Sequence, residues 1–293
     1  MDAIRLEDLT KYYGKKRGID GITLTVSQGE FFGFIGPNGA GKSTTIRVLL
    51  GLIEKTAGNA RVCGLEAGKE TKSILAKVGY LPSEAIFYHG MRVKDILKLS
   101  SDLRKKDCGK TAAELCERLQ LSVSRRVEEL SFGNRKKVAI VCALQHHPDV
   151  LILDEPTSGL DPLMQREFFE ILKERNKAGA TVFLSSHILS EIQRNCTRAA
   201  MIREGKIIAC DSVEALARTS IRRVTVCGSA SLAGLDGIRD KKNVGEQTSF
   251  LYSGDMNLLL KKLAEGQISD LTISEPDLEE IVLHYYEKDG ERL

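Results

Sequence analysis

The sequence has no tryptophan, and aromatic residues make up only 5% of its 293 residues. It also has no apolar run near the ~20 residues that a membrane-spanning helix needs, and no apolar segment after its first residues that would indicate a signal peptide. The net charge of +3 is too small to indicate nucleic acid or an anionic lipid surface as a partner. A role at a membrane would therefore require docking to another protein.

Paired cysteines are missing as well. The seven cysteines occur singly, none of them in a CxxC pair, and an odd number cannot all pair within one chain. This pattern predicts buried, reduced thiols in a cytosolic protein.

Strand-like and helix-like patterns alternate along most of the chain. Apolar runs at residues 31–35, 150–153 and 181–184 read as buried strands, and helix-like stretches separate them. Such alternation predicts a mainly parallel sheet with helices on both faces. A helical pattern between Met91 and His147 interrupts it and is typical of an insertion in the sheet.

The composition changes after about residue 220. A strand pattern at 222–226, polar glycine-rich sequence and a helix pattern at 257–264 are followed by a final amphipathic helix that Ser274 can cap. We therefore expect a large α/β domain over residues 1–218 and a small α+β domain over residues 219–293.

A glycine-rich loop stands between the first buried strand and a helix. Its sequence fits the phosphate-binding pattern GxxxxGK[ST]: Gly36-Pro37-Asn38-Gly39-Ala40-Gly41-Lys42-Ser43-Thr44. Glycines let backbone N–H groups turn toward phosphate oxygens, and the helix points its positive end at the same anion. Lys42 would contact the β- and γ-phosphates, and Ser43 would offer its hydroxyl to Mg²⁺.

Two carboxylates, Asp154 and Glu155, follow the strand at 150–153. The carboxyl ends of strands are where ligands bind in open α/β sheets. Asp154 is placed to hold Mg²⁺ through water, and Glu155 to polarise the water that attacks the nucleotide. Together with the glycine-rich loop, this pair predicts nucleotide hydrolysis.

Further segments resemble the landmarks of ABC (ATP-binding cassette) transporter ATPases, in the order of that family and over roughly residues 1–218. They are an adenine-stacking loop, a signature motif usually written LSGGQ, the segment after the catalytic glutamate and a switch-histidine motif: Lys11-Tyr12-Tyr13-Gly14, Leu130-Ser131-Phe132-Gly133-Asn134, Pro156-Thr157-Ser158-Gly159-Leu160-Asp161 and Ser185-Ser186-His187. The resemblance implies a P-loop NTPase cassette with an N-terminal antiparallel β subdomain and a helical subdomain at about 86–147.

The resemblance also implies roles for these residues. Tyr13 would stack on the adenine, and His187 would contact the γ-phosphate or the attacking water. Ser131 and Gly133 would close over the ATP held by a second cassette, and Asp161 would let the two cassettes sense each other. The implied partners are ATP, Mg²⁺, a second cassette that is identical or homologous, and an integral membrane permease, with no nucleic acid. The implied location is the cytoplasmic face of the cell membrane.

The chain departs from the family pattern at several positions. Gly79-Tyr80-Leu81-Pro82-Ser83-Glu84 resembles the Q-loop, but Ser83 stands where glutamine is usual, and serine is too short to contact Mg²⁺ directly. Either a water bridges the gap, Glu84 substitutes, or hydrolysis is slower or differently coupled. In the signature, Phe132 replaces a glycine and Asn134 a glutamine. The basic run that follows, Arg135-Lys136-Lys137, could reach phosphates across a dimer, but we expect a solvated face.

The tail at residues 275–283 resembles the C-terminal extension of cassettes in the drug-, antibiotic- and bacteriocin-export branch, although any closing amphipathic helix would have a similar pattern. It predicts export through a separate permease. A soluble ABC ATPase of the translation or DNA-repair type is the alternative, but those carry two cassettes or a long coiled coil. A GTPase would need NKxD, and residues 176–179 lack its aspartate.

Overall fold

The computed structural model of the chain describes residues 1–217, 221–229, 232, 234–274 and 276. The chain divides into two compact units, Met1–Val213 and Glu214–Leu293, and each contains its own hydrophobic cluster. In the described part, no helix is long and apolar enough to cross a membrane. The expected final helix and nearly all of the tail at 275–283 lie outside the described residues.

The central sheet of the first unit has six strands in the order β10-β9-β3-β8-β7-β6. Their bounds are β3 (Phe31–Ile35), β6 (Val78–Leu81), β7 (Val150–Asp154), β8 (Thr181–Ser186), β9 (Arg198–Arg203) and β10 (Lys206–Ser212). All neighbours pair in parallel except β9 and β10. Every residue of β3 and β7 is buried, because both faces of the sheet are covered. The prediction of a mainly parallel sheet is confirmed.

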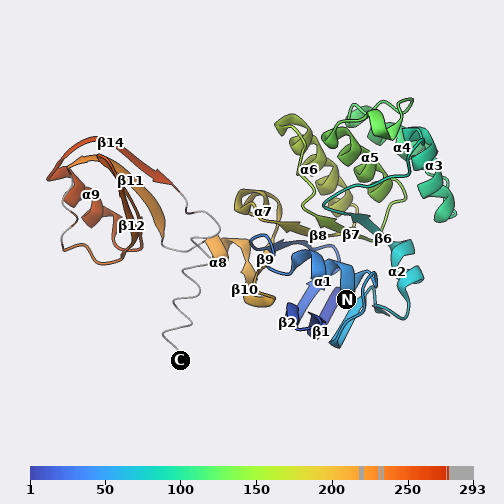
Figure 1. Cartoon of the computed structure of the whole chain (residues 1–293), viewed down its shortest axis with the longest axis horizontal. Coiled ribbons are helices and arrows are strands. Elements are labelled where there is room, and N and C mark those ends of the chain that lie inside the picture. Colours follow the sequence, from blue (N-terminus) through green and yellow to red (C-terminus); the bar gives the residue numbers. More distant parts are fainter. Residues whose placement is uncertain (218–220, 230–231, 233, 275, 277–293) are drawn as a thin grey trace. The chain divides into compact units, whose positions relative to one another are not determined.

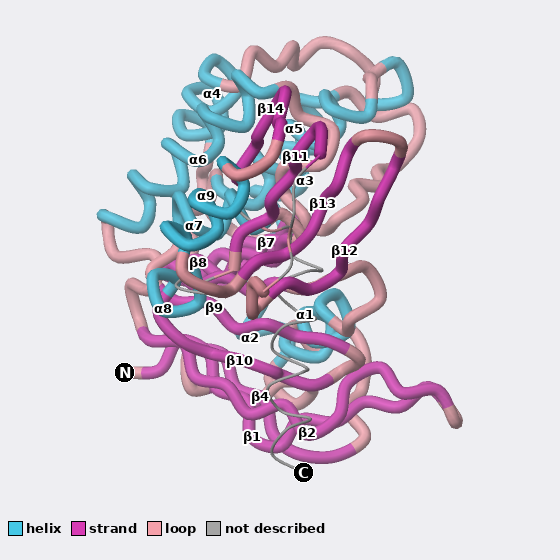
Figure 2. The backbone as a smooth tube through the Cα atoms, turned by 90° about the vertical axis from the view of Figure 1, so that its left-hand side faces the viewer, coloured by secondary structure: helices cyan, strands magenta, loops and turns pink. Residues whose placement is uncertain are grey.

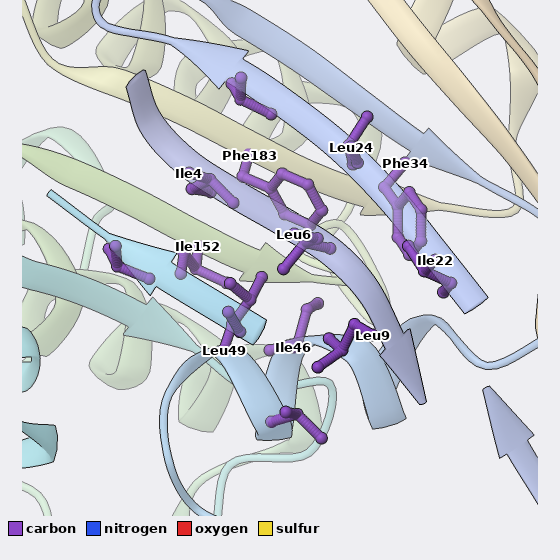
Figure 3. Close-up of a cluster of buried hydrophobic side chains, with 14 of the residues drawn as sticks. Ile4, Leu6, Leu9, Ile22, Leu24, Phe34, Ile46, Leu49, Ile152 and Phe183 are labelled. Atoms are coloured by element: carbon purple, nitrogen blue, oxygen red, sulfur yellow. The ribbon is translucent and has the colours of Figure 1, made fainter. Parts of the chain in front are cut away.

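A second sheet, ordered β2-β1-β4-β5, is antiparallel. Its strands are β1 (Asp2–Tyr13), β2 (Lys16–Ser27), β4 (Ala57–Val62) and β5 (Leu65–Glu66). Helix α1 (Lys42–Leu49) shares one hydrophobic cluster with both sheets: Figure 3 shows Ile46 and Leu49 among side chains such as Leu6, Ile152 and Phe183. The helix that follows the glycine-rich loop is therefore held by two sheets.

The helical insertion lies between β6 and β7. It consists of α3 (Val93–Leu103), α4 (Gly109–Arg118), the short 3₁₀ helix η1 (Val127–Glu129) and α5 (Phe132–Leu144). Figures 1 and 2 show α3, α4 and α5 together on the side of the central sheet away from β1 and β2. The remaining helices of this part of the chain are α2 (Thr71–Lys77), α6 (Pro162–Lys177), α7 (Leu189–Asn195) and α8 (Val213–Ala217).

Beyond α8, the second unit is an antiparallel sheet with one further described helix. The strand order is β12-β13-β11-β14, with β11 (Arg222–Ser229), β12 (Ile238–Val244), β13 (Gln247–Tyr252), β14 (Gln267–Ser274) and α9 (Met256–Ala264). Leu259 and Leu263 of α9 are buried with Val224, Phe250 and Tyr252 of the sheet. Asp255 caps the helix by accepting from the Asn257 N–H at 2.9 Å.

All seven cysteines are free, but the expectation that they are buried is wrong for several of them. Cys108, Cys116 and Cys196 are buried, whereas Cys210 is exposed. Cys210 lies on β10, an edge strand of the central sheet, and a side chain at a sheet edge retains access to water.

Candidate functional site

A cavity of about 490 Å³ gathers several of the predicted site residues. It lies where β3, β6 and β7 end, because the carboxyl ends of parallel strands meet at one edge of a sheet. Its lining comes from the glycine-rich loop after β3 with the start of α1, the residue after β7, the loop after β6, the end of β1 and the start of β2: Pro37, Asn38, Gly39, Gly41, Lys42, Ser43, Thr44, Glu155, Ser83, Tyr13, Lys16, Arg17 and Gly18.

The glycine-rich loop has a backbone path that side chains would obstruct. A Cβ on Gly36 would lie 2.2 Å from the carbonyl oxygen of Ile202, and Gly41 has φ +111° with no room on the side of Gly18. Lys42 is only 5% exposed, and its Nζ donates to the carbonyl oxygens of Gly36 at 2.6 Å and Pro37 at 3.2 Å. The ammonium is thus held against the loop, at the wall of the cavity.

Glu155 lies between two nitrogen groups. Its Oε1 is 3.2 Å from the Lys42 Nζ, and its Oε2 is 2.7 Å from the Nδ1 of His187. Its φ of +46° is unusual for a residue other than glycine, and such strain persists only where the surrounding structure enforces it. The Glu155 N–H donates to the Ser185 carbonyl at 3.1 Å, which holds this backbone beside the end of β8.

Asp154 precedes Glu155 at the end of β7 and is 2% exposed. Its Oδ1 accepts from the Ser185 hydroxyl at 2.9 Å. The carboxylate of Asp154 and the hydroxyl of Ser43 are hard oxygen donors, which suit Mg²⁺, a cation that takes few protein ligands beside phosphate oxygens and water. The donor set of the site therefore fits magnesium.

Tyr13 lies at the rim of the cavity and is 45% exposed, so it is not a core aromatic. The Lys11 ammonium lies 5.3 Å from the centre of its ring, and Gly18 leaves the room that the ring occupies. The neighbouring cations Lys16 and Arg17 also line the cavity. Our reading of the sequence missed both, although a run of cations directly after the Tyr13 loop could have indicated an anion-binding wall.

The signature segment and Asp161 do not line this cavity. Ser131 caps α5, with its Oγ accepting from the Asn134 N–H at 3.3 Å, and Asp161 caps α6, with its Oδ1 accepting from the Met164 N–H at 3.0 Å. The segment packs on Gly159 instead: a Cβ there would lie 2.2 Å from the Phe132 ring, and one on Gly133 would lie 2.4 Å from the Gly159 carbonyl oxygen. Within one chain, the signature segment and the glycine-rich loop therefore remain separate.

The solvated face expected for the run 135–137 is wrong for two of its three residues. Lys136 is 1% exposed and Lys137 is 9% exposed, because α5 packs against α3, α4 and β6. The Lys136 Nζ donates to the carbonyl oxygens of Pro82 at 2.9 Å, Ser83 at 3.0 Å and Glu155 at 3.0 Å. Burial lowers the pKa of this ammonium to about 8, and the nearby carboxylates of Asp154 and Glu155 offset that effect only partly.

Comparison with known proteins identifies similar sequences. A family model described as ABC transporter matches residues 19–158. The bacitracin transport ATP-binding protein of Bacillus licheniformis is 39% identical over 212 residues, which are 70% of this chain and 68% of that protein. The linearmycin resistance ATP-binding protein of Bacillus subtilis is 33% identical over 303 aligned positions, covering 96% of this chain and 97% of that protein.

Solved structures share the fold of the first unit. The ATP-binding subunit of an ABC transporter superposes with a TM-score of 0.70 at 28% identity, over 74% of this chain and 92% of that one. A dimeric ATP-binding cassette in a post-hydrolysis state, bound to ADP and Pi, superposes with a TM-score of 0.64 over 72% of this chain and 98% of that one. At 21% identity, the second likeness concerns the fold alone.

Proposed function

The chain belongs to the ATP-binding subunits of ABC transporters, and from this membership we propose which of its residues perform the reaction and what the reaction drives. As a subunit of that family, it binds and hydrolyses ATP to energise transport. Its site residues, its cation and its partners are the subject of the proposal.

ATP occupies the cavity at the carboxyl edge of the central sheet. Backbone N–H groups of the loop at 38–44 and the ammonium of Lys42 hold the β- and γ-phosphates, and the exposed ring of Tyr13 stacks on the adenine. The Ser43 hydroxyl, and Asp154 through water, hold Mg²⁺, which neutralises phosphate charge when bound. Ser83, at the same wall, reaches that cation only through a water.

Glu155 polarises the attacking water. The observation that carries this role is its position between Lys42 and His187, at 3.2 Å and 2.7 Å. The Lys42 ammonium pairs here with a carboxylate, and the γ-phosphate is the stronger anion. When ATP binds, Lys42 turns to the phosphate and Glu155 is free to accept a proton from water. His187 keeps the carboxylate oriented and faces the γ-phosphate.

A second cassette completes the site. ABC ATP-binding proteins act as dimers of cassettes, and this chain keeps its signature segment away from its own cavity. We propose that Ser131, Phe132, Gly133 and Asn134 close over the ATP of the second cassette, identical or homologous, and that Asp161 contacts the facing cassette. Binding of two ATP molecules and dimer closure are then one event.

Transport requires a membrane partner. Two relatives are named for bacitracin transport and linearmycin resistance, and these names favour export of an antibiotic-like compound by this chain as well. We propose that it docks on the cytoplasmic face of an integral membrane permease through the loop at 83–90 and the helical insertion, and that it has no nucleic-acid partner. The soluble, non-transport ATPase is not favoured, because these relatives are transporter and resistance proteins.

The role of Glu155 is tested with Glu155→Gln, which keeps the size of the side chain and removes its basic oxygen. We expect ATP affinity to be retained or raised, since Lys42 no longer pairs with a carboxylate, and turnover to fall by about 100-fold or more. Nucleotide binding and phosphate release are measured on the purified full chain.

Glu170→Gln is the matched control, because Glu170 is an exposed carboxylate on α6 that pairs with Lys173. It should leave binding and turnover unchanged. Normal turnover in Glu155→Gln would refute the role of Glu155.

A further inference from the structure

Lys136 places a buried charge at the centre of three chain segments. It extends from α5, and its Nζ lies 2.9–3.0 Å from the carbonyl oxygens of Pro82, Ser83 and Glu155. An ammonium has three N–H donors, and the three carbonyl oxygens accept one hydrogen bond from each of them. No part of this arrangement depends on the side chains of Ser83 or Glu155, because only their backbone oxygens accept.

The same helix carries the signature at its start. Ser131 is the N-cap of α5, and Lys136 lies little more than one turn further along. Every residue of α5 from Lys136 to Val141 is buried, so the helix is held as a rigid element. A displacement of the helix start at Ser131 would therefore move Lys136 as well.

The carbonyl oxygens that accept from Lys136 belong to two segments at the wall of the cavity in the same chain. Pro82 and Ser83 follow β6, and Glu155 follows β7, where its φ of +46° is enforced by its surroundings. In this chain Ser83 replaces the glutamine that usually links this loop to the cation. A contact to the backbone of residue 83 provides a link that a short side chain does not weaken.

A simpler role for Lys136 would be to fill space and satisfy carbonyl groups. Removing an ammonium from water is costly, however, and the low pKa of about 8 reflects that cost. An aliphatic side chain would avoid this penalty, but it would leave the carbonyl oxygens of Pro82, Ser83 and Glu155 without this donor. The buried charge is better explained by what it holds together.

We infer that Lys136 is a positioning residue that couples the signature helix to the catalytic Glu155 of its own chain, so that closure of the signature over the ATP of the second cassette sets the position of Glu155. The inference rests on the proposed roles of Glu155 and of the signature. According to this inference, the backbone at Ser83 and Glu155 links the two ATP sites of a dimer.

The test compares Lys136→Met, which keeps the length and removes the donors, with Lys136→Arg, which keeps charge and donors. In the full chain, Lys136→Met should lower kcat by about 10- to 100-fold, the effect of losing hydrogen bonds to a charged group. Its Kd for ATP should stay within about threefold of the wild type, and the Hill coefficient for ATP hydrolysis should fall toward one. Lys136→Arg should recover a large part of kcat.

Lys177→Met is the control for loss of a lysine, because Lys177 is exposed at the end of α6. Thermal unfolding of each variant shows whether it folds, and Lys136→Leu, which also has no donors, takes the place of Lys136→Met if the latter does not fold. A donor-free variant that is folded and keeps both kcat and the Hill coefficient would overturn the inference. So would a loss of kcat that only follows a loss of ATP binding, or a Lys136→Arg variant no better than Lys136→Met.

The variants also separate this inference from the proposed function. If Glu155→Gln hydrolyses ATP normally, the proposed catalytic role of Glu155 fails. The inferred coupling through Lys136 then has no catalytic residue to act on. If Glu155→Gln is inactive while the Lys136 variants are normal, the coupling alone fails. The double variant Lys136→Met, Glu155→Gln should still dimerise in ATP, since closure depends on the signature and the nucleotide; absence of a dimer there would show general damage and overturn the inference.

Discussion

At the scale of single residues, the proposed site depends on a few side chains that hold one another in place. Lys42 and Glu155 neutralise each other at 3.2 Å, and Lys136 holds the backbone of Ser83 at 3.0 Å. The side chain of Ser83 lines the cavity but is short. Residue 83 is therefore anchored through its carbonyl oxygen and not through its side chain.

Lengthening that side chain should increase activity. In Ser83→Gln, the amide oxygen can reach the region between Ser43 and Glu155 that a serine hydroxyl cannot, so we expect ATP turnover to rise by about two- to tenfold. The steady-state rate of phosphate release measures it. Ser73→Gln, an exposed position on α2, is the control. An unchanged rate would show that the short side chain does not limit hydrolysis.

At the scale of elements, α5 serves two purposes at its first turn. The Ser131 hydroxyl accepts from the Asn134 N–H and so satisfies one of the free N–H groups at the helix start. In the proposed dimer, the same hydroxyl faces the γ-phosphate of the second cassette. A loss of activity on mutation could therefore come from a frayed helix or from a lost phosphate contact.

Two substitutions separate these effects. Ser131→Ala should destabilise the chain by about 1 kcal/mol, the usual cost of losing an N-cap, whereas Ser131→Asn should keep the cap and most of the stability. Both should lose at least about tenfold in turnover, because neither presents a hydroxyl to phosphate. Urea unfolding and ATP hydrolysis are measured in parallel. Full turnover in Ser131→Asn would mean that capping is the whole role of this serine.

At the scale of the whole molecule, the cavity lies entirely within the unit Met1–Val213. The second unit has a separate core and contributes no lining residue in the described part of the chain. Because the signature and the glycine-rich loop of one chain do not meet, the proposed site is complete only in a dimer of cassettes.

The membrane partner should co-purify. If the tagged chain is expressed in its native cell and membranes are solubilised gently, mass spectrometry should find a polytopic membrane protein in a stoichiometric amount. The Glu155→Gln variant, held in the closed dimer, should retain it at least as well. Recovery of ribosomal or DNA-associated proteins with no membrane protein would leave the ATPase intact and refute the permease.

The sequence by itself determined those features of this protein whose residues are adjacent in the chain. The loop at 36–44, the pair Asp154 and Glu155 and the alternation of strands and helices are readable because phosphate binding and buried strands require particular residues at adjacent positions. The sheet and the helical insertion followed from that local pattern.

Only the tertiary structure decided which distant residues meet. The pairing of Lys42 with Glu155 and the burial of Lys136 depend on segments far apart in the chain. In the sequence, Lys136 is one cation in a basic run, and such runs usually face solvent. Its three carbonyl partners come from two other loops, so no local pattern could reveal that this lysine is inside.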